Sequence, residues 1–285
     1  MSKTKLSEYI APEKRSLISG PFGSSISSKY FVESGIPVIR GNNLTFDSRK
    51  FIDKGFAFIT KEKADELNTY ALPGDIIFTA AGTIGQVGLI TNDLRFDEYI
   101  ISNKQIRARL NESKIDINFA YFILNSEYVR RQIINSDTGS TIPLINLSII
   151  RDIDLPTFHI NEQRKIAAVL SALDDKIELS RRMNVELEQM ARTLYDYWFV
   201  QFDFPDADGK PYKSSGGAMK HSPELNRQIP ADWEVITLDN ILSKRTEASK
   251  PSANLKCVDL SVMPSSSLSI TEYSNGDAFN SNMKK

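Results

Sequence analysis

The 285-residue chain is poor in the residues that build several kinds of site. It has one cysteine, Cys257, so no disulfide can form within the chain. Its two histidines, His159 and His221, leave little for a structural zinc site, and we expect no bound metal. The amino-terminal segment lacks the apolar core of a signal peptide, and no apolar stretch is long enough to span a bilayer. These absences favour a cytoplasmic protein without a membrane partner.

The net charge is close to zero, and common enzyme motifs are absent from the sequence. The 35 basic and 36 acidic side chains give a net charge of -1, whereas nucleic-acid-binding domains are often strongly basic. Any DNA-binding claim must therefore rest on local features. The sequence has no G-x-x-x-x-G-K-[ST] phosphate loop, no G-x-S-x-G elbow and no H-E-x-x-H pair. We expect no catalytic residue in this chain.

The first 155 residues predict strand-rich structure, because short apolar stretches alternate with Gly, Pro, Asn and Ser. The candidate strands are Pro37 to Arg40, Phe56 to Thr60, Asp75 to Ala80, Gln86 to Ile90 and Gln105 to Leu110. In the last strand Arg107 and Arg109 alternate with apolar residues, so we expect both cations on a solvated face. Two helices are also expected: Lys61 to Leu67, capped by Thr60, and Asn118 to Ile134.

Four polar segments lie between these elements. Thr79 to Gly88 has the wrong glycine spacing for a nucleotide-binding loop and predicts a β-hairpin with a polar tip. Gly20 to Tyr30, Arg40 to Asn43 and Asn135 to Thr141 are rich in small hydroxyl and amide side chains. Such groups suit phosphate contacts and hydrogen bonds to base edges. The alternative is that these segments are plain solvated turns.

The segment from Glu162 to Val200 predicts one long helix, since it contains neither Gly nor Pro. Its apolar side chains follow the 4-3 spacing of a coiled-coil seam. The seam positions are Ile166, Leu170, Leu173, Ile177, Ser180, Asn184, Leu187, Ala191, Leu194 and Trp198. So narrow a stripe needs a partner helix in water. Packing of the helix on its own domain is the alternative, and periodicity alone does not decide between them.

The carboxyl-terminal third predicts a polar linker over residues 203–228 and a new ordered pattern from Ile229 to Leu242. Within that pattern Trp233, Val235 and Leu238 are core candidates. The remaining residues are too few for a domain the size of the first. We therefore expect a second domain that is cut short.

An ordered set of short motifs runs through the chain. From Gly139 to Glu178 it comprises Gly139-Ser140, Asn146-Leu147, Ile153 to Pro156, and Glu162-Gln163 with Ile166. Upstream it comprises Gly20 to Ser24, Gly35 to Arg40, Pro73 to Ile76 and Gly82 to Gly85. This set resembles the specificity subunit of type I restriction-modification systems, in the same order.

The resemblance implies an α+β chain with four parts: a target recognition domain over 1–158, a spacer helix over 159–202, a linker over 203–228 and an incomplete second recognition domain over 229–285. It implies a non-catalytic DNA reader of one half of a bipartite site. The long helix would dock methyltransferase subunits, which modify adenine with S-adenosylmethionine, and a restriction motor subunit would join the complex with ATP and Mg. This chain itself is expected to hold no cofactor.

We expect DNA contacts from the polar segments and partner contacts from the helix seam. The DNA-binding candidates are Ser24, Ser25, Lys29, Arg40, Asn42, Asn43, Thr79, Thr83, Ser136, Thr138, Ser140 and Thr141. Two alternatives remain open, because the family's usual second helix is missing from this sequence. A second copy could supply it, giving a dimer that reads a palindromic split site. Otherwise the chain occupies methyltransferase subunits without reading DNA.

Overall fold

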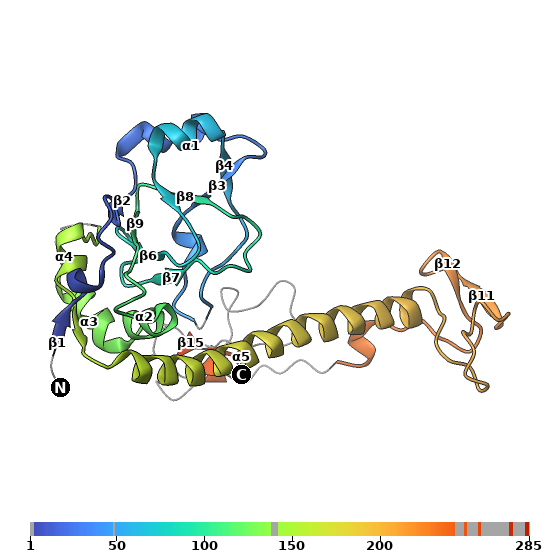
Figure 1. Cartoon of the computed structure of the whole chain (residues 1–285). Coiled ribbons are helices and arrows are strands. Elements are labelled where there is room, and N and C mark those ends of the chain that lie inside the picture. The colour runs from blue at the N-terminus through green and yellow to red at the C-terminus, as the bar shows by residue number, and fades with distance from the viewer. Residues whose placement is uncertain are drawn as a thin grey trace. The chain divides into compact units, whose positions relative to one another are not determined.

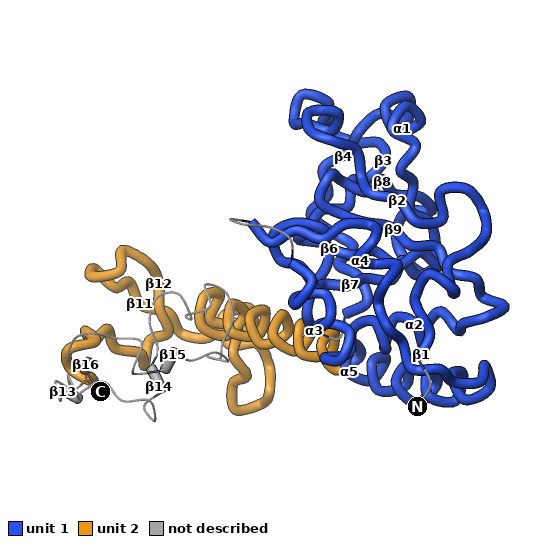
Figure 2. The backbone as a smooth tube through the Cα atoms, turned by 90° about the vertical axis from the view of Figure 1, so that its left-hand side faces the viewer, with its two compact units in different colours: residues 1–179 blue, residues 180–285 orange. Residues whose placement is uncertain are grey.

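The computed structural model describes residues 3–47, 49–137 and 142–242, with the short strands at 248–249, 256–257, 274–275 and 283–284. The chain divides into two compact units, residues 1–179 and residues 180–285 (Figure 2). The mixture of helices and sheets confirms the expected α+β class. Among the described helices, none has the length and apolar character needed to cross a membrane.

The first sheet of unit 1 has four antiparallel strands in the order β2-β9-β6-β7 (Figure 1). These strands are β2 (Leu17–Ser19), β6 (Ile76–Thr79), β7 (Val87–Leu89) and β9 (Gln105–Ala108). Strands β6 and β7 form the expected hairpin. Gly82 and Gly85 near its tip have φ angles of 89° and 88°, which side chains disfavour.

The second sheet has the order β4-β3-β8-β5 and contains one parallel pair, β3 with β8. Its strands are β3 (Ile36–Ile39), β4 (Ala57–Ile59), β5 (Tyr70–Ala71) and β8 (Tyr99–Ile101). Strands β3 and β4 confirm the sequence prediction, whereas β2, β5 and β8 were missed. Two or three residues are too few to establish a period of two, so neighbouring strands rather than local pattern define these elements.

Four short helices and a small ribbon complete the outside of unit 1. Helix α1 (Lys61–Leu67) begins as expected, because the hydroxyl of Thr60 accepts a hydrogen bond from the amide of Lys63 at 3.2 Å. The other elements are α2 (Ile117–Leu124), α3 (Glu127–Asn135), α4 (Leu147–Arg151), and strands β1 (Lys3–Lys5) and β10 (Asp154–Pro156), which pair with each other.

The prediction of a single helix from Asn118 to Ile134 is wrong. Helix α2 ends at Leu124, and Ser126 caps a separate helix α3 by accepting a hydrogen bond from the amide of Val129. The hydroxyl of Ser126 also donates to the carbonyl of Ile123 at 2.6 Å. A serine that bonds the backbone on both sides competes with the helical pattern, which outweighs the continuous apolar spacing.

Helix α5 (Ile160–Tyr195) is one unbroken element of 36 residues, followed by a π-helical turn over Asp196–Val200. Its first turns are tied to unit 1, where Gln163 and Ala167 are buried. The side-chain oxygen of Gln163 accepts from the amide of Asp116 at 2.9 Å, and its nitrogen donates to the carbonyl of Phe158 at 2.9 Å. The expected long helix is therefore confirmed.

Unit 2 places an aromatic cluster where the sequence predicted a polar linker. Phe204 stacks on Tyr212 with ring centroids 4.8 Å apart and on Trp233 at 5.6 Å, while Phe202 is buried. Asp203 accepts hydrogen bonds from the amide and hydroxyl of Ser214 at 2.7 and 2.6 Å. The scattered aromatics of this segment therefore pack with one another despite the polar residues between them, and its assignment as a linker between domains stays a prediction.

The strands of unit 2 are short and paired in two-stranded ribbons. They are β11 (Met219–Ser222) with β12 (Arg227–Pro230), β13 (Ala248–Ser249) with β16 (Met283–Lys284), and β14 (Lys256–Cys257) with β15 (Ser274–Asn275). Trp233 is half-buried as a core candidate should be. Val235 and Leu238 are 38% and 69% exposed, so their assignment to the core is wrong for this unit.

Candidate nucleic-acid interface

A cleft of about 510 Å³ opens where strands of both sheets of unit 1 end. Parallel strands β3 and β8 bring Arg40 and Ser102 to the same edge, since each residue directly follows its strand. From the first sheet, Thr79 ends β6 and Gln105 begins β9. The cleft is lined by Ile26, Phe31, Val38, Arg40, Gly41, Asn42, Thr79, Ala81, Gly82, Thr83, Gln86, Ser102, Asn103, Lys104 and Gln105.

Backbone hydrogen bonds join the walls of this cleft. The amide of Ser102 donates to the carbonyl of Ile39 at 3.0 Å, and the amide of Ala80 donates to the carbonyl of Lys104 at 2.7 Å. The amide of Gly20 donates to the carbonyl of Gln105 at 2.9 Å. The Ser102–Gln105 segment therefore bridges the two sheets and holds the cleft in a fixed shape.

The electrostatic character of the cleft is positive and polar. Arg40 and Lys104 are among its lining residues, and among the described residues no aspartate or glutamate lines it. Asn42, Asn103 and the hydroxyl group of Thr83 add donors and acceptors. A surface that offers cations and amides without carboxylates suits a ligand with phosphates and polar base edges.

Four of the predicted DNA contacts meet in this cleft: Arg40, Asn42, Thr79 and Thr83. Thr79 is 2% exposed, and its hydroxyl donates to the side-chain oxygen of Gln86 at 3.0 Å. Because that hydroxyl is committed inside the fold, Thr79 orients Gln86 rather than facing solvent. Thr83 and the Arg40–Asn42 turn are exposed.

The prediction that Asn43 contacts DNA is wrong for this fold. Asn43 is fully buried, and its side-chain oxygen accepts from the backbone amide of Arg40 at 2.9 Å. Its side-chain nitrogen donates to the carbonyls of Ile52 and Lys54 at 2.9 and 3.0 Å. Asn43 therefore fixes the turn that presents its neighbours.

The remaining predicted contacts lie elsewhere or outside the described residues. Ser24, Ser25 and Lys29 are exposed on short 3-10 turns, with the ammonium of Lys29 4.7 Å from the ring centroid of Tyr30. Ser136 directly follows helix α3 as its C-cap residue, and its hydroxyl donates to the carbonyl of Gln132 at 2.8 Å. Thr138, Ser140 and Thr141 lie outside the described residues, so their role stays a prediction.

Sequence reasoning missed the segment that closes the cleft. Ser102 to Gln105 (SNKQ) is a polar stretch between two apolar strands, the same signal that marked the other loops. Gln105 is fully buried, and its side-chain oxygen accepts a hydrogen bond from the hydroxyl of Ser102. Among the described residues nothing accepts a hydrogen bond from its side-chain nitrogen, so a donor is left unsatisfied at the base of the cleft.

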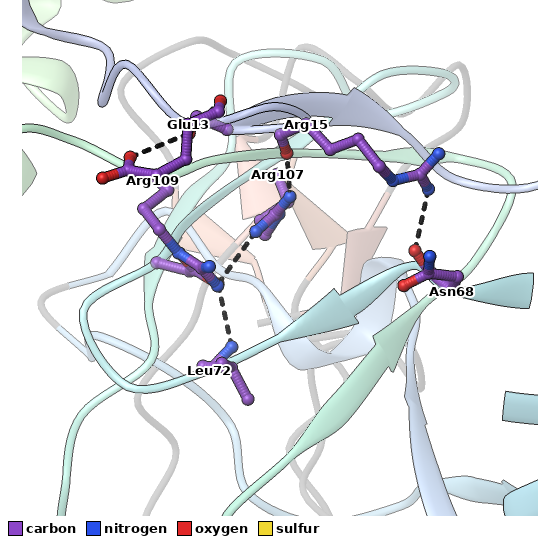
Figure 3. A network of polar contacts seen from close by, with 8 residues as sticks. Glu13, Arg15, Asn68, Leu72, Arg107 and Arg109 are labelled. Atoms are coloured by element: carbon purple, nitrogen blue, oxygen red, sulfur yellow. Dashed lines mark hydrogen bonds and ion pairs between the residues drawn. The ribbon is translucent and has the colours of Figure 1, made fainter. Parts of the chain in front are cut away.

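A buried charge cluster lies in the first sheet (Figure 3). The carboxylate of Asp75 bonds the guanidinium of Arg109 twice at 2.8 Å and lies 3.5 Å from Arg107. The expectation that both arginines face solvent is wrong, because Arg107 is 4% exposed. Burial lowers the pKa of Arg107, while the hydrogen bond to Asp75 raises the pKa of Arg109. The cluster holds β6 to β9, which carry two residues of the cleft.

The seam of helix α5 divides into a covered beginning and an exposed remainder. Ile166 packs partly against the core of unit 1. Further along, Leu173, Ile177, Leu187 and Leu194 are 54%, 41%, 57% and 46% exposed. Of the other seam positions, Leu170 and Trp198 are half-buried and Asn184 is exposed. No group of three or more metal-ligating side chains occurs in the part of the chain that the structure describes.

The chain is similar to several known proteins. Residues 22–189 match the family described as "Type I restriction modification DNA specificity domain". The chain is 27% identical over 235 residues to the MjaIX specificity subunit of Methanocaldococcus jannaschii, covering 82% of this chain and 51% of that protein. It is 32% identical over 169 residues to the HindI specificity subunit of Haemophilus influenzae, covering 58% of this chain and 34% of that protein.

Solved structures of two S subunits also match. For the subunit from M. genitalium the TM-score is 0.49 at 17% identity, covering 71% of this chain and 46% of that one. For the HsdS subunit from Thermoanaerobacter tengcongensis the TM-score is 0.46 at 16% identity, covering 73% and 50%. The chain thus spans about half, or less, of the length of the relatives it matches.

Proposed function

Because the chain belongs to the type I restriction-modification DNA specificity family, we propose that its first unit reads one half of a bipartite DNA sequence. The observation that carries this proposal is the cleft, where Arg40, Lys104 and several amide side chains converge without a carboxylate among the lining residues. Cations attract phosphate oxygens, and Arg, Asn and Gln side chains read base edges. Family and site chemistry support the same function.

In this proposal the chain is non-catalytic and recruits the subunits that react with DNA. Methyltransferase subunits would dock on helix α5 and modify adenine with S-adenosylmethionine, and a motor subunit would use ATP and Mg. The exposed seam residues Leu173, Ile177 and Leu187 supply apolar area for such a partner. Apolar side chains left in water on a long helix favour association.

A second copy of the chain is another candidate for the same surface. The 4-3 spacing of the seam is the pattern that pairs two helices, and the exposed polar Asn184 would fix their register. A two-fold dimer would present two reading units to a palindromic split site. Sedimentation of the chain over a range of concentrations distinguishes this assembly from a monomer that needs a different partner.

Sequence-selective DNA retention tests the proposal. The chain has a net charge of -1, so we expect weak binding alone and tight binding once a methyltransferase subunit adds phosphate contacts. Selection from random duplexes should enrich one half-site with the complex. A complex that forms but enriches no sequence would contradict DNA reading and favour the interaction-only alternative.

A further inference from the structure

The turn that follows β3 presents two side chains anchored on one backbone carbonyl. The guanidinium of Arg40 and the side-chain nitrogen of Asn42 each donate to the carbonyl oxygen of Gly55 at 3.3 Å. Both side chains are exposed and line the cleft. The shared acceptor therefore holds an arginine and an amide next to each other before any ligand arrives.

Two residues behind this pair keep it in place. Asn43 accepts a hydrogen bond from the amide of Arg40 within the turn, and its side-chain nitrogen ties the turn to the carbonyls of Ile52 and Lys54. Gly55 has a φ of 72°, and a Cβ atom there would lie 3.3 Å from the side-chain nitrogen of Asn42. A side chain at position 55 would both strain the backbone and crowd the amide. The geometry is therefore built from four residues, two whose side chains line the cleft and two that support them.

The anchoring also decides which atoms face outward. One N–H of the Asn42 amide donates to Gly55, which orients the amide so that its oxygen is left to accept and its second N–H to donate, and no described residue donates to that oxygen. Arg40 makes no ion pair among the described residues and keeps further N–H groups to donate. In the major groove an acceptor recognises the amino group of adenine or cytosine, while an arginine recognises O6 and N7 of guanine.

The geometry points to Arg40 and Asn42 as a specificity-determining pair that reads a guanine and a neighbouring amino-bearing base, with Gly55 and Asn43 as positioning residues. This inference rests on the proposed function and names the atoms that perform it. Positioned donors and acceptors discriminate bases only when their supporting residues hold them still. It follows that Gly55 affects base choice without touching DNA.

The test selects duplexes with the full chain in complex with a methyltransferase subunit and repeats the selection with variants. Arg40→Ala should abolish a guanine preference at one position, and Asn42→Ala an adenine or cytosine preference beside it, each by roughly five- to 150-fold. Gly55→Ala should weaken both preferences together. Lys14→Ala, which removes the same charge as Arg40→Ala from an exposed site outside the cleft, should leave the selected sequence unchanged.

The outcomes separate the two levels of the proposal. A wild-type complex that selects no sequence would refute both the proposed function and this pair. A wild-type selection that Arg40→Ala and Asn42→Ala leave unchanged, or weaken equally at every position, would refute the pair alone. If Gly55→Ala does not fold, Arg40→Ala and Asn42→Ala still test whether the pair reads bases. Thermal unfolding checks that each of these two variants is folded.

Discussion

Replacing Asp75 by asparagine should destabilise unit 1 more than any surface charge change. The Asp75 side chain is 1% exposed, and the Arg107 side chain beside it is 5% exposed. Asparagine keeps the size but removes the charge, leaving the Arg107 guanidinium buried without a counterion. Breaking a buried pair from one side costs about 3–5 kcal/mol. That is a large part of the ~5–15 kcal/mol that stabilises a typical domain.

Urea unfolding of the full chain at neutral pH, followed by far-ultraviolet circular dichroism, measures this loss. The matched control is Asp154→Asn, whose carboxylate is 36% exposed and pairs with Lys5 at 2.9 Å. That exposed pair should contribute little, because water screens both charges. Adding Arg107→Met to Asp75→Asn should recover stability, because the buried charge is then gone. Equal losses for Asp75→Asn and Asp154→Asn would refute the reasoning.

Three further changes probe the fold and the cleft. Hydrogen bonds from Ser214 lower the pKa of Asp203 below its usual value, so the Asp203 carboxylate stabilises unit 2 at pH values above its unfolded pKa and stabilises it less as the pH falls. Asp203→Asn should therefore flatten the acid dependence of unfolding followed by tryptophan fluorescence, because both tryptophans lie in unit 2. An acid profile that the substitution leaves unchanged would contradict this prediction. Gly20→Ala would place a Cβ atom 1.8 Å from the carbonyl oxygen of Ser102, so we expect the free energy of unfolding to fall by about 1–3 kcal/mol or more, measured by thermal unfolding. A variant as stable as the wild type would show that the backbone at the cleft can shift to accept the methyl group. Lys104→Ala should weaken binding of all duplexes evenly and reduce the salt slope by about one; a change confined to one sequence would argue against a phosphate contact.

The sequence predicted the elements that carry a long or strong local pattern. The unbroken helix from Ile160, the Thr60 cap and the β6–β7 hairpin all follow from composition and turn residues close in the chain. The polar loops were also identified, although only some of them meet. Which loops converge depends on strand order, and the parallel pairing of β3 with β8 joins segments about sixty residues apart.

Two of the errors share a physical cause, which is burial of polar groups whose partners lie outside the local sequence pattern. Alternation placed Arg107 in solvent, but Asp75 on the neighbouring strand compensates its charge inside the sheet. Composition placed Asn43 on the surface, but three backbone groups satisfy its amide within the fold. Spacing alone reveals neither partner, so buried polar residues were taken for solvent-facing or DNA-facing ones.

Hydrogen exchange of the chain with and without its selected duplex tests the central claim most directly. Our account predicts slower exchange at residues 40–43 and 102–105 on DNA binding, because these segments form the cleft. Helix α5 should not change unless a methyltransferase subunit is also present. Protection confined to α5 or to unit 2, with the cleft segments unaffected, would show that DNA is read somewhere else.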